Sequence, residues 1–474
     1  MAHKLLRHSL IYTGGNITAR GLNFLIQITV WSNIFGPADY GQIAYCYVFI
    51  SFMAVVLPFG LDAAFMNFYL RRKEQNAYFT NVYLLILALA AGFVLVFFLF
   101  RRSLAPLAIR SDMPQLLALS LLILFFDIIN NLGILYLRAE ERAGLSVILQ
   151  NIEILLRLLL LILLVSSFSA RIIHILWANV LSSFVLFVVL NMLMLPRLHF
   201  SLLSRPMIRE LTLFGLPFML SGIFDRSIEL ADRRLLGFYL DDAAVGMYVA
   251  SYTVAVLIRL LVYSFNAGWQ PYFLREIDRP QGLERMEKIY MRTAGLLMLF
   301  WVLASLWMPE IIRIPLGSGR HILNEAYWSA IPVIPVIMGA YVLMGLYFLE
   351  LPGIYYRNKT YLNALFMGIA ALVNIGLNVL LIPRYGMMGA AFATAAAYAV
   401  MAALIRLWNI KNTPIKRGNI KLLLMVGLSL GSYLLLQAGF INTGTRIAGS
   451  LIYAALMYVL MQLTMDNGQW AIDN

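Results

Sequence analysis

Long apolar segments follow one another along the whole chain, separated by short polar stretches. A helix needs roughly 20 apolar residues to cross the hydrocarbon core of a bilayer, and segments of that length recur from one end of the sequence to the other. The pattern predicts an all-α polytopic membrane protein with about fourteen transmembrane helices. The predicted helices cover residues 9–35, 42–70, 78–100, 116–137, 144–165, 172–195, 209–239, 243–273, 286–308, 328–356, 360–382, 388–410, 419–440 and 445–465.

Composition supports this prediction and narrows the classes of function. Hydrophobic residues make up 62% of the 474 residues, whereas a soluble domain has roughly 45–50%. The longest outer loops, residues 101–115 and 309–327, hold no paired-carboxylate motif, and the histidines are scattered. A single cysteine, Cys46, supports neither a disulfide nor a Cys-based metal site. We therefore expect no enzyme, no metal site and no bound cofactor.

The formal net charge of +13 would suggest nucleic acid as a partner if the protein were soluble. In a membrane protein, the loops on the cytoplasmic side collect Lys and Arg. With the N-terminus inside, those loops hold 21 basic residues and the opposite loops hold 8. The sequence therefore predicts both termini in the cytoplasm and no nucleic-acid partner. Thr13, Asn16 and Arg20 interrupt the first apolar segment, which favours a spanning helix over a cleaved signal.

Polar residues form a stripe on the first predicted helix. Thr13, Asn16, Arg20, Asn23 and Gln27 fall within an arc of roughly 80° at helical spacing. A charged side chain at mid-bilayer costs roughly 2.5–3.5 kcal/mol on insertion scales, so such residues usually face protein or a water-filled cavity. We expect this stripe to face inward.

The seventh predicted helix is the most highly charged. Asp225, Arg226, Glu229, Asp232 and Arg233 occupy an arc of roughly 120°. Glu229 can pair with Arg226 or Arg233, because residues three and four apart are neighbours on a helix. The eighth helix likewise aligns an arginine with tyrosines and an asparagine on one stripe; these are Tyr252, Arg259, Tyr263 and Asn266.

Two interpretations of the buried arginines remain open. Arg20, Arg226 and Arg259 could form ion pairs that hold helices together, or they could line a cavity and contact an anion. Arginine suits phosphate oxygens because its planar fork donates two parallel hydrogen bonds. The candidate substrate-binding residues are Arg20, Asn23, Gln27, Asp225, Arg226, Glu229, Arg233, Arg259 and Tyr263.

Other intramembrane charges have simpler interpretations. Glu153 and Arg157 are four residues apart and are predicted to neutralise each other. Arg406 is predicted to extend to the cytoplasmic surface, as long basic side chains near helix ends often do. Pro58 and Gly60 lie inside the second predicted helix, where proline permits a kink.

Weak internal repetition suggests how the helices are grouped. A shift of 205 residues relates Asp39-Tyr40-Gly41 to Ala244-Val245-Gly246, and it aligns Arg20 with Asp225. Transporters are often built from repeated halves. We predict an N-terminal six-helix bundle at residues 1–200, a second bundle at residues 201–412, and two additional helices at residues 413–474.

Three stretches in order along the chain resemble one transporter family. Residues 374–394 place Asn374 and Asn378 at a helix end, then Pro383, two spaced glycines and a run of small residues that permits close helix approach. Gly215-Leu-Pro217 precedes Ala231-Asp232-Arg233 and Val245-Gly246. Residues 36–41 and 60–64 form the third stretch. Together they resemble the polysaccharide transporter family, the O-antigen and exopolysaccharide flippases of the multidrug/oligosaccharidyl-lipid/polysaccharide (MOP) exporter superfamily.

The resemblance implies two six-helix bundles around a central cavity and two extra C-terminal helices. It implies transport of a polyprenyl-diphosphate-linked oligosaccharide across the bacterial cytoplasmic (inner) membrane by alternating access, without ATP and often with H⁺ or Na⁺ coupling. The implied partners are the lipid-linked oligosaccharide, membrane lipids, and polysaccharide polymerase or assembly proteins. The absence of a Walker-type glycine loop from the sequence agrees with this. The alternatives within the superfamily are a lipid II flippase and a multidrug or cation antiporter.

Overall fold

The protein is almost entirely helical and divides into two compact units. The computed structural model describes residues 21, 24–168, 171–277, 279, 282–413, 419–437 and 443–466. One unit comprises residues 1–249 and the other residues 250–474. The bundle boundaries predicted at residues 200 and 412 stay a prediction.

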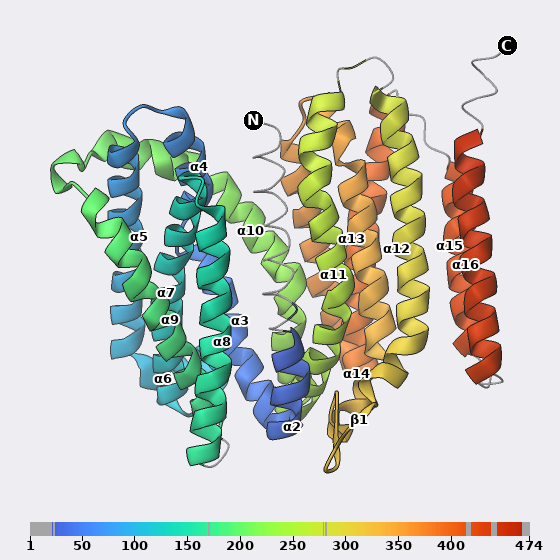
Figure 1. Cartoon of the computed structure of the whole chain (residues 1–474), viewed down its shortest axis with the longest axis horizontal. Coiled ribbons are helices and arrows are strands. Elements are labelled where there is room, and N and C mark those ends of the chain that lie inside the picture. Colours follow the sequence, from blue (N-terminus) through green and yellow to red (C-terminus); the bar gives the residue numbers. More distant parts are fainter. Residues whose placement is uncertain are drawn as a thin grey trace. The chain divides into compact units, whose positions relative to one another are not determined.

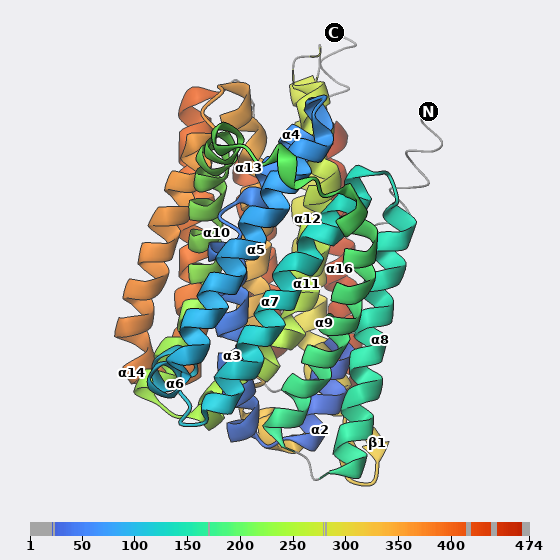
Figure 2. The ribbon, with the colours of Figure 1, turned by 90° about the vertical axis from the view of Figure 1, so that its left-hand side faces the viewer.

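Most of the long helices of the first unit run roughly side by side, and α10 slants across the others (Figures 1 and 2). Helix α7 contacts α3, α5 and α9, and α10 contacts α3, α4 and α5. The elements are η1 (Ile26–Trp31), α2 (Ser32–Ile34), α3 (Pro37–Val56), α4 (Leu61–Arg71), α5 (Gln75–Leu99), α6 (Arg101–Ile109), α7 (Pro114–Ala139), α8 (Ala143–Ser167), α9 (Ile172–Met194), η2 (Leu195–Arg197), η3 (Phe200–Leu202), α10 (Arg205–Tyr239) and the start of α11 (Asp242–Glu276).

The second unit is built around α13, which is buried along most of its length. Helix α13 contacts α12 and α14, while α15 and α16 pack against α12 and against each other. A short antiparallel hairpin, β1–β2, connects α12 to the segment before α13 (Figure 1). The elements after α11 are α12 (Gly282–Ile312), β1 (Pro315–Gly317), β2 (Arg320–His321), η4 (Glu325–Ala330), α13 (Val333–Tyr356), α14 (Tyr361–Asn412), α15 (Asn419–Gln437) and α16 (Thr443–Asp466).

Eleven of the described helices are long and apolar enough to cross a membrane. Helix α14 covers the two predicted spans 360–382 and 388–410. Gly386 lies between them with φ 56° and ψ −134°, a backbone conformation that glycine adopts readily, and it divides α14 into two helical parts. Helix α15 adds a shorter apolar segment at residues 420–435. The predicted helix 9–35 falls mainly outside the described residues. The helices from α3 onward account for the remaining predicted spans.

The second predicted helix, residues 42–70, is two helices rather than one. Helix α3 ends at Val56 and α4 begins at Leu61. Between them Phe59 and Gly60 have φ values of 55° and 70°, in the left-handed region that ends a helix. The proline at position 58, expected to kink the helix, therefore lies at a complete break.

Three glycines of the first unit bring backbones into direct contact. A Cβ on Gly41 would meet the carbonyl oxygen of Asp242, and one on Gly246 would meet that of Pro37. A Cβ on Gly60 would likewise meet the carbonyl oxygen of Gly215. These contacts join α3 to the start of α11, and α4 to α10. The motifs related by the 205-residue shift therefore pack against each other.

The exposed apolar residues have the pattern of a lipid-facing surface. On α8, Ile148, Ile152, Leu155, Leu159 and Ile162 are each at least half exposed. Their spacing of three and four residues places them on one side of the helix. Such a stripe is stable when hydrocarbon rather than water covers it.

Candidate functional site

The charged residues of α10 separate into two pairs. Arg226 Nη1 lies 2.7 Å from Glu229 Oε2, and the Glu229 side chain is 8% exposed while that of Arg226 is 33% exposed. The predicted pairing of Glu229 with Arg226 is therefore confirmed. Asp225, the first charge of the stripe, is partly exposed. Glu229 binds one nitrogen of the Arg226 guanidinium, and the side chain is partly exposed. The other N–H groups of Arg226 are therefore accessible to a second acceptor.

Asp232 and Arg233 form the second and more deeply buried pair. Arg233 Nη1 lies 3.1 Å from Asp232 Oδ1, and the guanidinium also donates to the main-chain oxygen of Glu229. Tyr248 Oη of α11 donates to Asp232 Oδ2 at 2.6 Å. Asp232 is fully buried. This arrangement neutralises the charge of Arg233 inside the protein.

Arg259 lies among tyrosine rings in the second unit. Its Cζ is 5.2 Å from the ring centroid of Tyr263 on α11 and 5.9 Å from that of Tyr341 on α13. Tyr341 Oη donates to Tyr252 Oη at 2.9 Å. The sequence stripe of Tyr252, Arg259 and Tyr263 therefore does form one cluster. Aromatic faces stabilise a guanidinium by about 0.5–2 kcal/mol without using its N–H groups.

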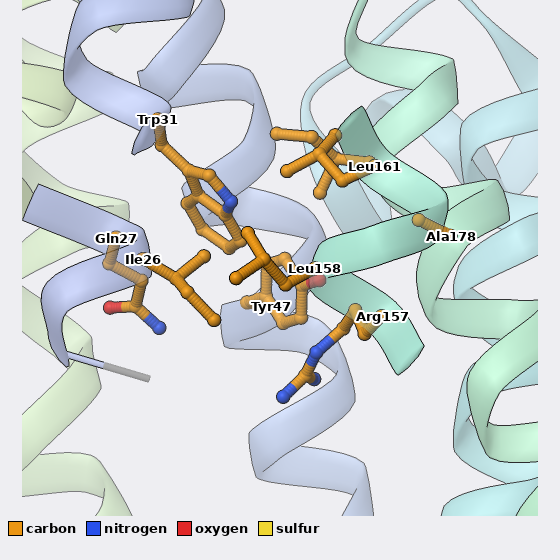
Figure 3. Close-up of a pocket in the computed structure, with 9 residues that line it drawn as sticks. Ile26, Gln27, Trp31, Tyr47, Arg157, Leu158, Leu161 and Ala178 are labelled. Atoms are coloured by element: carbon orange, nitrogen blue, oxygen red, sulfur yellow. The ribbon is translucent and has the colours of Figure 1, made fainter. Parts of the chain in front are cut away.

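A small pocket joins η1 to α8 in the first unit. Figure 3 shows Gln27 and Trp31 on one side, Arg157 and Leu158 on the other, and Tyr47 of α3 between them. The pocket has a volume of about 30 Å³, which is room for a water molecule but not for a sugar or a lipid chain. Of the predicted first-helix stripe, only Gln27 can be placed, because Arg20 and Asn23 lie outside the described residues.

Arg157 is part of a polar network that links three helices inside the first unit. Its Nη1 lies 3.9 Å from Glu153 Oε1 and donates to Asn179 Oδ1 at 3.2 Å. Asn179 in turn donates to Tyr47 Oη at 3.1 Å, and Ser182 donates to Glu153 at 3.2 Å. The predicted Glu153–Arg157 pair is confirmed. Asn179 and Ser182 were not among the predicted residues, although their spacing of three residues places them on one side of α9.

Arg406 does not extend to the surface, and that prediction is wrong. Its Nη1 lies 2.7 Å from Glu350 Oε1, with side chains 15% and 2% exposed. Asn409 also donates to Glu350 Oε2, at 2.6 Å. A buried carboxylate on the neighbouring helix α13 provides a stronger partner than the membrane surface would.

A much larger cavity lies in the first unit, beside α10. It has a volume of about 450 Å³ and is lined by residues of α3, α5, α6 and α10, including Phe49, Phe52, Leu107, Arg226 and Arg234. Arg226 thus reaches a cavity, as the sequence interpretation allowed. Arg234 was not among the predicted site residues, although it follows Arg226 by eight residues and so lies on the same helical face.

Within each unit, the described members of the predicted site have different neighbours. Glu229 and Arg233 engage in ion pairs, Arg226 lines the large cavity, Gln27 lines the small pocket, and Arg259 and Tyr263 contact each other in the second unit. Among the described residues, no group of three or more His, Cys, Asp or Glu side chains is placed to hold a metal ion.

Comparisons with known proteins place this arrangement in context. The sequence profile of the family described as "Polysaccharide biosynthesis protein" matches residues 5–277. No curated protein sequence matches the chain.

Several solved transporters share the fold. The lipid II flippase MurJ, in an inward closed conformation, superposes with a TM-score of 0.72 and 15% identity, covering 98% of this chain and 100% of that one. An inward-facing multidrug resistance MATE family transporter of the MOP superfamily gives a TM-score of 0.68 and 14% identity, covering 88% and 99%. A MOP superfamily transporter from Pyrococcus furiosus, whose binding pocket is described as having reverse polarity, gives 0.55 and 15%, covering 86% and 95%.

Proposed function

The chain belongs to the polysaccharide biosynthesis protein family and has the fold of the MOP superfamily transporters, and from this premise we propose that it is a flippase for a polyprenyl-diphosphate-linked oligosaccharide. The substrate would be an O-antigen or exopolysaccharide repeat unit, moved across the bacterial cytoplasmic (inner) membrane by alternating access. Both termini would lie in the cytoplasm. The protein would have no catalytic role and would deliver its substrate to polysaccharide polymerase or assembly proteins.

The main support is the presence of guanidinium groups on membrane-spanning helices in both units. Arg226 on α10 has a carboxylate partner and reaches a cavity. Arg259 on α11 lies against the rings of Tyr263 and Tyr341, whose faces attract and position a guanidinium. A diphosphate is a suitable ligand for such groups, because each guanidinium can donate two parallel hydrogen bonds to phosphate oxygens.

The free-energy cost of moving the charged diphosphate through hydrocarbon favours a carrier that binds the head group and leaves the lipid chain in the membrane. Moving an uncompensated charge into hydrocarbon costs several kcal/mol, whereas the polyprenyl chain is already soluble there. We propose that Arg226 and Arg259 compensate the diphosphate during its passage. Arg20 of the first helix would contact the diphosphate or an acidic sugar, and Asn23 and Gln27 of the same helix stay candidate substrate contacts. Entry of H⁺ or Na⁺ would drive the cycle.

The test is flipping of a fluorescent lipid-linked oligosaccharide in proteoliposomes, read by a quencher that cannot cross the membrane. We expect Arg226→Ala and Arg259→Ala each to slow flipping by about tenfold or more, the effect of losing a charge-assisted hydrogen bond. Arg209→Ala on α10 and Arg275→Ala on α11 are matched controls, because both side chains are exposed. Both controls should flip at the wild-type rate.

Three results would overturn the proposal. Undiminished flipping by both Arg226→Ala and Arg259→Ala would remove the role of these arginines. Extrusion of cationic dyes without lipid flipping would identify a multidrug antiporter. Flipping of lipid II in preference to a lipid-linked oligosaccharide would identify a lipid II flippase. Size-exclusion profiles of each variant in detergent establish that a loss of rate is not a loss of folding.

A further inference from the structure

The cavity beside α10 has the chemistry of a site for an amphipathic anion. Ten of its thirteen lining residues are apolar, among them Phe49 and Phe52 of α3 and Phe97 of α5. Its volume of about 450 Å³ lies within the range of roughly 300–1,000 Å³ that is typical of small-molecule sites. The apolar wall suits a hydrocarbon chain.

The polar part of the wall is positively charged. Arg226 and Arg234 line the cavity from one face of α10, eight residues and hence about 12 Å apart along the helix axis. No carboxylate is among the lining residues of this cavity. Arg234 Nη1 donates to the main-chain oxygen of Ala108 at 3.4 Å, and among the described residues no carboxylate lies within ion-pair distance of it. Because Glu229 compensates the charge of Arg226, the excess positive charge of the cavity wall comes from Arg234.

A third arginine stands close to Arg234. Arg110 ends α6 in the left-handed conformation, with φ 49°, and its Cζ lies 5.7 Å from the ring centroid of Tyr45. Arg110 interacts electrostatically with Arg234. Its buried Nε has no hydrogen-bond partner among the described residues. Like charges that act on each other in a low-dielectric environment repel, and a bound anion relieves that repulsion.

A sugar is a poor occupant for this cavity. Sugar hydroxyls need donors and acceptors on every side, and the only uncharged polar lining residue is Ser227. Its hydroxyl already donates to the main-chain oxygen of Ile223 at 2.8 Å. A buried hydroxyl without a partner costs roughly 1–3 kcal/mol. The occupant must therefore be the lipid end of a molecule rather than its oligosaccharide end.

We propose that this cavity binds the diphosphate and the first isoprenoid units of a polyprenyl-linked lipid, with Arg234 and Arg226 on the diphosphate and the phenylalanines on the chain. The assignment rests on the proposed flippase function for its choice of lipid. It adds a binding site within the first unit alone, bounded by α3, α5, α6 and α10. Arg234 becomes a substrate-binding residue, and the sugar is bound elsewhere.

The test measures equilibrium binding of farnesyl diphosphate, a short isoprenoid diphosphate, to the full-length protein in detergent. Ser227→Phe fills the cavity from α10 and removes only a bond within its own helix. Ser221→Phe is the matched control, because Ser221 also donates to the main-chain oxygen four residues earlier and does not line the cavity. Arg234→Ala removes the charge, with the exposed Arg209→Ala as its control.

We expect Ser227→Phe and Arg234→Ala each to weaken farnesyl diphosphate binding by about ten- to a hundredfold, as expected for a blocked site or a lost charge-assisted bond. The two controls should stay within about twofold, as surface changes away from the site usually do. Farnesol and inorganic diphosphate alone should bind more weakly than farnesyl diphosphate, because each supplies one half of the interaction.

Undiminished binding in Ser227→Phe would overturn the assignment. So would equal or tighter binding of a short-chain phosphatidylglycerol, which would identify a general site for anionic phospholipids. The failure of the flippase function is distinguishable from the failure of this site. If the wild-type protein binds farnesyl diphosphate in the cavity but flips no lipid-linked oligosaccharide, the site assignment stands and the proposed flippase function is wrong. If Ser227→Phe and Arg234→Ala flip lipid-linked oligosaccharide at the wild-type rate, the flippase function stands and this cavity is not a substrate site.

Discussion

Removing Arg406 alone is expected to destabilise the protein more than removing Arg406 together with the charge of Glu350. The Glu350 side chain is 2% exposed and receives hydrogen bonds from Arg406 at 2.7 Å and from Asn409 at 2.6 Å. Arg406→Met deprives this buried carboxylate of its guanidinium counter-charge. Breaking a buried ion pair from one side costs about 3–5 kcal/mol.

The double variant Glu350→Gln with Arg406→Met removes both charges and keeps an acceptor for Asn409. Replacing both partners of a buried pair by uncharged groups of similar size is often nearly neutral. We expect the double variant to lose about 1–2 kcal/mol, mainly from one imperfectly satisfied amide. The two substitutions are therefore predicted to be strongly non-additive, which is the signature of a direct interaction.

The assay is unfolding in mixed detergent micelles with increasing dodecyl sulfate, which yields a free energy of unfolding for each variant. Arg384→Met is the matched control, because Arg384 lies on the same helix and is exposed. If Arg406→Met costs no more than Arg384→Met, Arg406 is not held in a buried pair. If the double variant loses as much as the sum of the two single variants, Glu350 is not stabilised by Arg406.

Three further substitutions, one of them with a matched control, test helix packing and buried hydrogen bonds. Gly246→Ala is expected to cost about 1–3 kcal/mol, because its Cβ would collide with the backbone of α3, whereas Gly268→Ala on the same helix has open space and should be neutral or stabilising by up to about 1 kcal/mol; thermal unfolding in detergent would show the opposite signs. Tyr248→Phe removes the hydroxyl that donates to the fully buried Asp232 and should cost about 1.5–3 kcal/mol, with a smaller loss refuting a charged Asp232. Trp301→Phe removes the indole donor to a main-chain oxygen on α13 at 2.8 Å and should cost about 0.5–1.5 kcal/mol in the same measurement.

The spanning helices could be predicted from the sequence because each must satisfy one strong constraint. A segment in hydrocarbon has to be apolar and long enough to bond its own backbone, and that requirement is visible in single segments. The breaks within helices were harder to predict. The break after α3 depends on left-handed backbone at Phe59 and Gly60. Phenylalanine rarely adopts this conformation, so the sequence does not predict the break there. Gly386 likewise interrupts α14. Many other glycines of the chain lie in regular helix, so a glycine alone does not predict a break.

The pairing of charges was predictable only within one helix. Spacings of three and four residues gave Arg226 and Arg233 as possible partners of Glu229, and the structure pairs Glu229 with Arg226. The partner of Arg406 lies on another helix, 56 residues earlier, and no local rule identifies it. The same limit explains why Arg234 was missed. Its position on the face of Arg226 was readable, but the cavity exists because α3 and α6 leave space there.

The glycines in the motifs that carry the family resemblance hold helices close together. They are therefore evidence for the fold and not for the substrate. Gly41, Gly60, Gly215 and Gly246 lie where backbones touch, and none of them lines the large cavity. Any transporter that needs these close approaches will keep such glycines, whatever it carries. The choice of cargo must then depend on the side chains that face open space. A relative with the same glycines and carboxylates in place of Arg226 and Arg234 is expected to share the fold and to prefer cations.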